Sequence, residues 1–380
     1  MSFMQYFDEY KKYLSDLVAF NTASSDNKAK DNSNAQLIDY LEDFFKDRNF
    51  YCHKFKVAEG KYNLYITSAK TDGGLMLCGH TDTVVAKEEL WESSPFTLVH
   101  KDDYLTGLGA TDMKGYVALI MLFASHGFSL KADKPFSALF TCDEESSMAG
   151  AIDYKQKYSY KPDLILIGEA TSNQAVIAHK GYMAFKMQVT GRGCHSSNPS
   201  LGINAIECSM AFLNEIAKLK DSLKDITDSR FEVASPTLNL GVISGGNGVN
   251  TVCPTVEIDF ELRPMSIYNT QQAYESLSAI TDKLNTQYGN IFKLQRLYDD
   301  IEPFDCTDEK TLDILKQATG SDLMCVNYCT EASFLGTIAP CAVLGPGTIK
   351  HAHSVNEKIA IAQLDEAYTQ LLTIYKQICM

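Results

Sequence analysis

The stretch Gly74-Leu75-Met76-Leu77-Cys78, continued by Gly79-His80-Thr81-Asp82-Thr83, decides how the rest of the chain is interpreted. The first five residues are an apolar run, which predicts a buried strand. The second five contain a histidine and an aspartate two positions apart, and such residues point to the same side in extended chain. We therefore predict that His80 and Asp82 share one small volume at the end of a strand, where open α/β folds bind their ligands.

Two further apolar runs of the chain end in acidic side chains. Residues 136–142 precede Asp143-Glu144-Glu145, and residues 163–168 precede Glu169. These predicted strands alternate with predicted helices, such as the apolar segment of residues 116–123. The alternation predicts an α/β fold with a mainly parallel sheet that is flanked by helices.

The sequence pattern changes near Lys180. Residues 181–290 contain strands and long helices in an alternation of their own, which predicts an inserted α+β domain. The earlier pattern resumes after residue 290 and continues to a final helix over residues 360–378. With 380 residues the chain is long enough for two domains. We predict a discontinuous catalytic domain, residues 1–180 and 291–380, interrupted by the inserted domain 181–290.

Composition excludes several classes of function. The formal net charge is −14 and basic residues are scattered, so we expect no nucleic-acid partner. No run of about 18 apolar residues is present and the first residues do not resemble a signal peptide, so we expect no membrane span. The 11 cysteines, in a long chain of this kind, are typical of reduced thiols in a cytoplasmic protein.

The acidic and imidazole side chains at the predicted strand ends can form one site. Asp112, from the glycine-rich loop 104–115, and the pair His351 and His353 add to this set. Ligands in open α/β sheets gather at the carboxyl ends of strands, so residues far apart in sequence can converge there. Several carboxylates in one pocket repel each other unless cations neutralise them. Imidazole together with carboxylate suits Zn²⁺, Co²⁺ or Mn²⁺, and two such ions activate water for hydrolysis.

Each of these residues also has a simpler interpretation. A histidine at a strand end can be a hydrogen-bonded loop residue. Adjacent glutamates occur in the acidic first turn of a helix, and Asp112 can cap the helix that follows it. The combination, at the ends of successive strands, favours a metal site over three separate coincidences. Spacing alone does not choose between His351 and His353.

Four motifs, in this order and spacing, resemble those of a known family: His80-Thr81-Asp82, residues 109–115, Asp143-Glu144-Glu145 and residues 168–171. The family is that of the zinc aminoacylases and carboxypeptidases, which are dinuclear metallohydrolases. Residues 194–205, 245–250 and 262–264 resemble the segments of its lid domain, so the resemblance covers nearly the whole chain. It implies a metallopeptidase-like catalytic domain with an inserted lid and dimerisation domain.

The resemblance implies two divalent metal ions, with zinc expected and cobalt as the alternative. His80, Asp112 and Glu169 are similar to the ligands of one ion. Asp112, Glu145 and His353 are similar to those of the other, so that Asp112 bridges. The family pattern of Ala-His followed by Glu selects His353 over its neighbour at position 351.

The catalytic roles are also implied by the resemblance. Glu144 matches the general base that takes a proton from the attacking water, and Asp82 matches the carboxylate that orients His80. His195 resembles a lid histidine that reaches the active site of the partner subunit and stabilises the oxyanion, which implies a homodimer formed through the lid domain. The peptide bond between Asp112 and Met113 is expected to be cis.

Residues 326–332, 344–347 and 352–357 are most similar to the acetylornithine deacetylase branch of the family. This similarity implies hydrolysis of a small N-acyl amino acid, N²-acetyl-L-ornithine, to L-ornithine and acetate in arginine biosynthesis. The alternatives are another N-acyl amino-acid hydrolase, such as a succinyl-diaminopimelate desuccinylase or an aminoacylase. A catalytically inactive binding or scaffold protein would have lost a ligand or the base, and every matched position is filled here.

The candidate substrate contacts are Asn250, Arg263, Thr330 and Glu331. Arg263 is suited to bind the substrate α-carboxylate with two parallel hydrogen bonds, but an ion pair with a structural role explains it equally well. We expect Glu331 to face the side-chain ammonium of ornithine.

Overall fold

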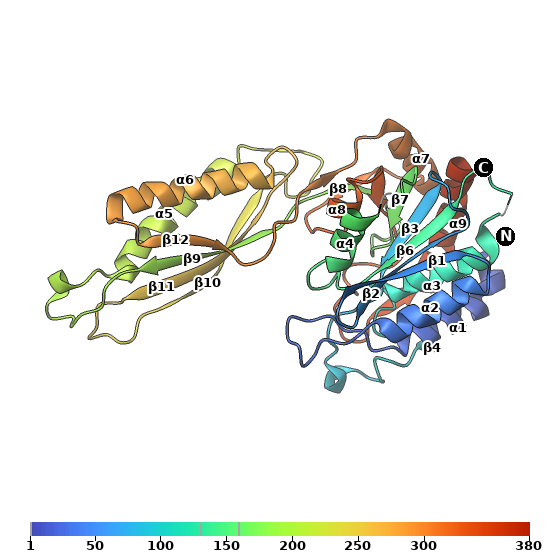
Figure 1. The fold of residues 1–380 in the computed structure, drawn as a ribbon, viewed down its shortest axis with the longest axis horizontal. Coiled ribbons are helices and arrows are strands. Elements are labelled where there is room, and N and C mark those ends of the chain that lie inside the picture. Colours follow the sequence, from blue (N-terminus) through green and yellow to red (C-terminus); the bar gives the residue numbers. More distant parts are fainter. Residues whose placement is uncertain (1, 130, 159) are drawn as a thin grey trace. The chain divides into compact units, whose positions relative to one another are not determined.

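The computed structural model describes residues 2–129, 131–158 and 160–380, and their packing divides into two units, each described separately (Figure 1). Unit 1 comprises Met1–Ile177, Cys306–Met324 and Thr330–Met380. Unit 2 comprises Ala178–Asp305 and Cys325–Cys329.

Unit 1 is built on a mixed sheet with the order β1-β2-β6-β3-β7-β15-β8. Its central strands β6, β3, β7 and β15 run parallel to one another, and the outer strands pair antiparallel. Their bounds are β1 (Tyr51–Ala58), β2 (Lys61–Thr67), β3 (Leu75–His80), β6 (Phe136–Thr141), β7 (Leu164–Ile167), β8 (Val176–His179) and β15 (Cys341–Val343). Beside it, β4 (Val99–Lys101), β5 (Tyr104–Thr106) and β16 (Lys358–Ala360) form a small second sheet. The predicted α/β fold with a mainly parallel sheet is confirmed.

Helices cover both faces of this sheet, because its central strands are apolar on both sides. Phe45 of α2 and Tyr375 of α9 contact rings on one face, at Phe140 and Phe136, where α3 also packs. On the other face, Tyr154 of α4 contacts Met76. The helices of unit 1 are η1 (Phe3–Tyr6), α1 (Phe7–Val18), α2 (Ala35–Lys46), η2 (Glu88–Leu90), α3 (Lys114–Leu122), η3 (Phe123–Gly127), α4 (Ala149–Lys157), α7 (Glu309–Thr319), α8 (Ala332–Leu335) and α9 (Ile361–Cys379).

The parallel centre of the sheet places the ends of β3, β6 and β7 at one edge. His80 is the last residue of β3, the turn after β6 carries Glu144 and Glu145, and Glu169 follows β7. The end of β7 packs closely against Tyr116 of α3 because Gly168 has no side chain; a Cβ at this position would lie 1.9 Å from the ring of Tyr116. The strand ends that the sequence analysis singled out therefore lie side by side.

Unit 2 is an antiparallel sheet with the order β10-β11-β9-β12, and α5 and α6 cover one of its faces (Figure 1). Along β11, Val256, Ile258, Phe260 and Leu262 are buried and alternate with half-buried residues, as a sheet covered on one face requires. The bounds are β9 (Met183–Thr190), η4 (Pro199–Leu201), α5 (Ala205–Leu223), β10 (Thr237–Gly245), β11 (Thr255–Arg263), α6 (Thr270–Tyr288), β12 (Phe292–Arg296), β13 (Phe304–Asp305) and β14 (Met324–Val326). The α+β character of the inserted segment is confirmed.

Unit 2 extends past residue 290, where the sequence pattern indicates the end of the insertion. The strand β12 pairs antiparallel with β9, and β13 pairs with Ala178 and His179 of β8. The chain returns to unit 1 only at Cys306. Among the described residues, no helix combines the length and the hydrophobicity needed to cross a membrane.

Candidate metal centre

His80 has no exposed surface and presents its two ring nitrogens to different partners. Its Nδ1 lies 3.0 Å from the backbone oxygen of Asp82 and 3.7 Å from the carboxylate of the same residue. Its Nε2 lies 3.0 Å from Asp112 Oδ1 and 3.9 Å from Glu169 Oε1. A proton on Nδ1 leaves the lone pair of Nε2 free for a ligand. The closer partner of Nδ1 is thus the backbone of Asp82, not its carboxylate.

The carboxylate of Asp82 has a different set of partners. It accepts hydrogen bonds from the backbone N–H groups of Glu144, at 3.2 Å, and Glu145, at 3.1 Å. Asp82 therefore ties the end of β3 to the turn that carries both glutamates. The expectation that Asp82 orients His80 stays a prediction, to which the structure adds this second contact.

Asp112 lies between the small sheet and α3, in a loop that is held by Glu357. The carboxylate of Glu357 is buried and accepts hydrogen bonds from the backbone N–H groups of Gly109 at 2.9 Å, Thr111 at 2.7 Å and Asp112 at 2.9 Å. Burial and the charge of Asp112 raise the pKa of Glu357, and the three N–H donors oppose this rise. The peptide bond from Asp112 to Met113 is cis, as the resemblance implied.

His353 completes the cluster from the loop after β15. Its Nε2 lies 2.8 Å from Glu145 Oε2 and 3.4 Å from Asp112 Oδ2. By contrast, His351 turns its Nδ1 to the backbone oxygen of Lys358, at 3.1 Å. The structure thus brings His353, and not its neighbour, to the carboxylates.

Burial, and after it mutual repulsion, raise the pKa values of two glutamates of the cluster, Glu144 and Glu169. Burial raises the pKa of Glu144 well above its ordinary range, and the charge of Glu169 raises it further. Burial likewise raises the pKa of Glu169, and the charge of Asp112 adds to the rise. Carboxyl groups in this state are short of positive charge.

The two histidines respond in the opposite sense. Burial lowers the pKa of His80, but Asp112 and Asp82 raise it well above its usual value. Hydrogen bonds to Asp112 and Glu145 raise the pKa of His353 to about 10. In the metal-free chain, protons on these imidazoles supply the positive charge that the carboxylates need.

The donor atoms fit divalent metal ions. Among the described residues, Oε1 of Glu145 and Oε1 of Glu169 are buried and have no hydrogen-bond partner. Two sets of donors each lie within 4.8 Å of one another: His80 with Glu144 and Glu169, and His80 with Asp112 and Glu145. Imidazole and carboxylate donors in this number suit transition-metal ions. The first set includes Glu144, so the geometry alone leaves it either a ligand or a base.

The other predicted substrate contacts of unit 1 are buried. Thr330 uses its Oγ1 to accept a hydrogen bond from the backbone N–H of Ala332, at the start of α8. Glu331 has no exposed surface, and its Oε2 lies 3.6 Å from the thiol of Cys78 in β3. Its charge raises the pKa of Glu144 and of Glu169, so it lies next to the cluster. A substrate ammonium would have to enter this buried space to meet Glu331.

The predicted lid residues lie in unit 2, with His195 and Asn250 near the start of β11 and Arg263 at its end. The Nδ1 of His195 accepts a hydrogen bond from the backbone N–H of Ser197 at 3.1 Å, which assigns the ring proton to Nε2. The backbone oxygen of Asn250 accepts a hydrogen bond from the N–H of Ser196, at 3.0 Å. The guanidinium of Arg263 lies over the ring of Tyr182, and two of its nitrogens each lie 3.4 Å from a carboxylate oxygen of Glu261. Such long contacts leave its guanidinium available to a carboxylate, so both interpretations of Arg263 stay open.

Two supporting residues of the centre were given no role in the sequence analysis. One is Glu357, whose buried carboxylate holds the loop that carries Asp112. The other is Lys61, whose ammonium lies 2.7 Å from Asp143, directly before the two glutamates. In the sequence, a single lysine carries no signal for such a contact.

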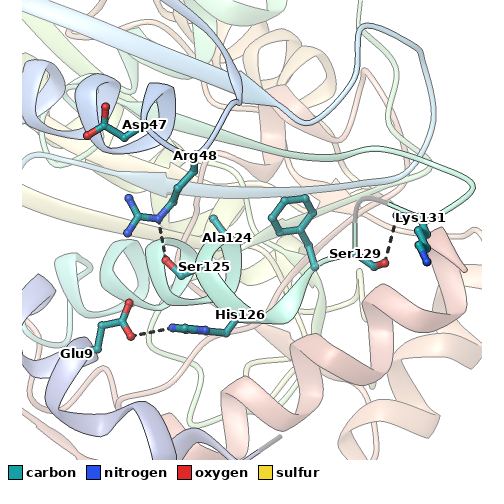
Figure 2. A pocket seen from close by; sticks show the side chains of 9 residues that line it. Glu9, Asp47, Arg48, Ala124, Ser125, His126, Ser129 and Lys131 are labelled. Carbon is teal, nitrogen blue, oxygen red and sulfur yellow. Dashed lines mark hydrogen bonds and ion pairs between the residues drawn. The ribbon is translucent and has the colours of Figure 1, made fainter.

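A separate hollow of unit 1 lies between α1, the end of α2 and η3 (Figure 2). Two contacts join residues that line it: His126 Nε2 lies 2.7 Å from Glu9, and Arg48 Nε donates to Ser125 at 3.0 Å. None of the predicted site residues lines it. We assign no chemistry to this hollow.

Comparison with known proteins places these observations in context. Residues 76–377 match the model of peptidase family M20/M25/M40. The chain is 36% identical over 347 residues to an acetylornithine deacetylase of Photorhabdus laumondii, covering 90% of both chains. It is 34% identical over 380 residues to an acetylornithine deacetylase of Pasteurella multocida, covering 99% of this chain and 100% of the relative.

Solved structures share the fold at lower sequence identity. A tripeptidase of Staphylococcus aureus matches with a TM-score of 0.76 and 20% identity, over 97% of this chain and 98% of that one. A dinuclear metal-binding peptidase of the M20 family from Bacillus subtilis matches with a TM-score of 0.68 and 11% identity, over 98% of each chain. Together the comparisons give the fold from structures and the family from sequence.

Proposed function

The chain belongs to peptidase family M20/M25/M40, and we propose that within it the protein is a metal-dependent amide hydrolase that removes the acetyl group of N²-acetyl-L-ornithine, releasing L-ornithine and acetate. The observation that carries the proposal is the convergence of His80, Asp112, Glu145, Glu169 and His353 on one small volume. Support for the acyl amino acid comes from the relatives of 34–36% identity that are named for this activity.

The five residues would hold two divalent metal ions, zinc or cobalt, with Asp112 between them. When bound, the ions would polarise the acyl carbonyl and lower the pKa of a water molecule. Asp112 is placed for this role because His80 lies 3.0 Å from its Oδ1 and His353 lies 3.4 Å from its Oδ2. Each of its two oxygens thus lies near one of the two imidazoles.

Glu144 would move the proton during hydrolysis. Its carboxylate takes a proton from the attacking water and returns it to the nitrogen of the leaving amine. A pKa that burial and Glu169 raise suits a group that must both accept and donate near neutral pH. The N–H of Glu144 is anchored on Asp82, which leaves the side chain free to reach the substrate.

His195 would stabilise the oxyanion from the partner subunit. With Nδ1 occupied by the N–H of Ser197, its Nε2 carries a proton and is a hydrogen-bond donor. A donor aimed at developing negative charge accelerates acyl transfer. The other candidate substrate contacts are Arg263 and Asn250, which belong to unit 2, and Thr330 and Glu331, which belong to unit 1.

A homodimer is required by this role of His195, and unit 2 offers a surface for it. The edge strand β10 exposes Leu240, Val242 and Ile243, by 44%, 56% and 60% respectively. An exposed apolar edge strand is a template for pairing with a second chain. Replacement of Ile243 by lysine is expected to yield monomers in light scattering, with Glu261→Lys on the neighbouring strand β11 as the control.

The proposed setting is the cytoplasm, where arginine biosynthesis would use the product. All 11 cysteines are free thiols, which suits a reducing compartment. The activity is tested by comparing N²-acetyl-L-ornithine, N-acetyl-L-methionine and N-succinyl-diaminopimelate after restoring zinc or cobalt. We expect the highest kcat/KM for acetylornithine. A higher value for the succinyl compound would make the chain a desuccinylase instead.

A further inference from the structure

Lys61, the first residue of β2, is a buried lysine whose ammonium is shared by two carboxylates. The residue is 4% exposed, and its Nζ lies 2.6 Å from Asp31 and 2.7 Å from Asp143. Burial lowers the pKa of Lys61, but the hydrogen bonds to Asp143 and Asp31 raise it above its ordinary value. The lysine is therefore charged, and the two carboxylates compensate its burial.

Asp143 connects this lysine to the two glutamates that follow it. Its backbone is left-handed, with φ of 56°, a conformation that residues other than glycine rarely adopt. Its side chain also accepts a hydrogen bond from Ser24 at 2.9 Å, and its backbone oxygen accepts from the N–H groups of Ser147 and Met148. The turn is thus fixed at Asp143 by its side chain and by its main chain.

The turn after β6 has two anchors. Asp82 holds the N–H groups of Glu144 and Glu145, and Lys61 holds the side chain of Asp143. Loss of the ammonium would leave a buried carboxylate unpaired, which is strongly unfavourable. Asp143 would have to turn toward solvent, and the backbone of the next two residues would move with it.

We propose that Lys61 is a positioning residue for the metal centre: by fixing Asp143, it fixes the main chain from which Glu144 and Glu145 project. Lys61 touches neither the substrate nor the metal ligands and acts through the turn alone. The effect on turnover rests on the proposed function, whereas the effect on metal binding does not. Asp31, in the loop before α2, pairs with the same ammonium.

The test compares Lys61→Met, which removes the charge, with Lys61→Arg, which keeps it. The matched control is Lys54→Met in β1, the strand next to β2, which breaks the ion pair to Asp39 of α2, at 2.5 Å, away from the turn. Cobalt is titrated into each metal-free protein and followed by its absorption spectrum. The kcat and KM are then measured with the best substrate of the panel.

We expect Lys61→Met to bind the second cobalt ion about 10–100-fold more weakly and to change the spectrum. Its kcat should fall by about 10–100-fold, while KM changes by less than about threefold because no substrate contact is lost. Lys61→Arg should recover most of both values, and Lys54→Met should match the parent protein. A Lys61→Met protein that is merely less heat-stable, with the spectrum, metal affinity and kcat of the parent, would overturn the proposal.

Asp143→Gly provides a second route if Lys61→Met does not fold. Glycine accepts a φ of 56° and removes the side chain on which Lys61 acts. We expect the same loss of cobalt affinity as in Lys61→Met, and unchanged affinity in Asp143→Gly would overturn the proposal. If the parent protein hydrolyses none of the three compounds, the proposed function fails, while the cobalt titration still decides the role of Lys61.

Discussion

Replacing Glu144 by glutamine separates the two roles that its position allows. The variant keeps the length and the hydrogen-bonding capacity of the side chain but cannot accept a proton. Its backbone anchor is unaffected, because the N–H of Glu144 donates to Asp82 whatever the side chain. The turn and the neighbouring Glu145 should therefore stay in place.

The size of the loss follows from the role. A general base contributes about 10²–10⁴-fold to the rate, which corresponds to about 3–5.5 kcal/mol of activation free energy. We expect kcat of Glu144→Gln and of Glu144→Ala to fall by at least about 10²-fold, with two metal ions still bound per chain. The assay is steady-state kinetics on the metal-restored variants, together with metal analysis of the same samples.

The alternative is that Glu144 binds a metal ion directly, since one of its carboxylate oxygens lies within 4.8 Å of the donor atoms of His80 and Glu169. In that case the variant would bind one ion instead of two. The matched control is Glu145→Gln, for which we do expect the loss of one ion, because Glu145 lies 2.8 Å from His353. A Glu144→Gln protein with near-parental kcat would refute the assignment of the base.

Three further predictions concern the centre and its support. We expect the stability of the metal-free protein to fall as the pH rises from 6.5 toward 10. The pKa of His353 is raised from 6.5 to about 10 in the folded chain, so its protonation stabilises the fold fully below pH 6.5. This contribution is lost as the pH passes 10. The raised pKa values of His80, Glu144 and Glu169 act in the same direction. The measurement is thermal unfolding of the chelated protein at several pH values, and a stability that rises with pH would contradict the prediction. His353→Ala should lose one metal ion in metal analysis and His351→Ala should keep two, and equal losses would show that the wrong histidine was chosen. Glu357→Gln should destabilise the metal-free chain by about 1–3 kcal/mol, because one of three buried N–H donors loses its acceptor; an unchanged unfolding midpoint in calorimetry would exclude this support of Asp112.

The parts of the fold that the sequence predicts are those encoded in contiguous residues. The buried strands β3, β6 and β7 are short apolar runs, and each ends in the group that it contributes to the site. Parallel pairing then brings His80, Glu144 and Glu169 together without further information. This part of the cluster is predictable because the same few residues mark both the end of a strand and the chemistry, and its role as a set of metal ligands stays a prediction.

The parts that the sequence does not predict depend on contacts between distant residues. Lys61 and Asp143 are far apart in the sequence, as are Gly109 and Glu357, and only the folded chain brings the members of each pair into contact. Pairing of β12 with β9 moves the return to unit 1 beyond residue 290, because an edge strand is assigned by its partner and not by its own pattern. Spacing alone leaves the choice between His351 and His353 open; the family pattern selects His353, and contacts with Glu145 and Asp112, distant in the sequence, hold it in the cluster.

The central claim is that this centre hydrolyses N²-acetyl-L-ornithine when metal ions are bound. It is tested most directly by titrating zinc into the metal-free protein while measuring the release of ornithine and acetate. We predict that the chelated protein releases neither product, and that both appear in equal amounts as zinc is added, with a plateau at two ions per chain. Release that is unaffected by chelation, or no release at any zinc concentration, would contradict the claim.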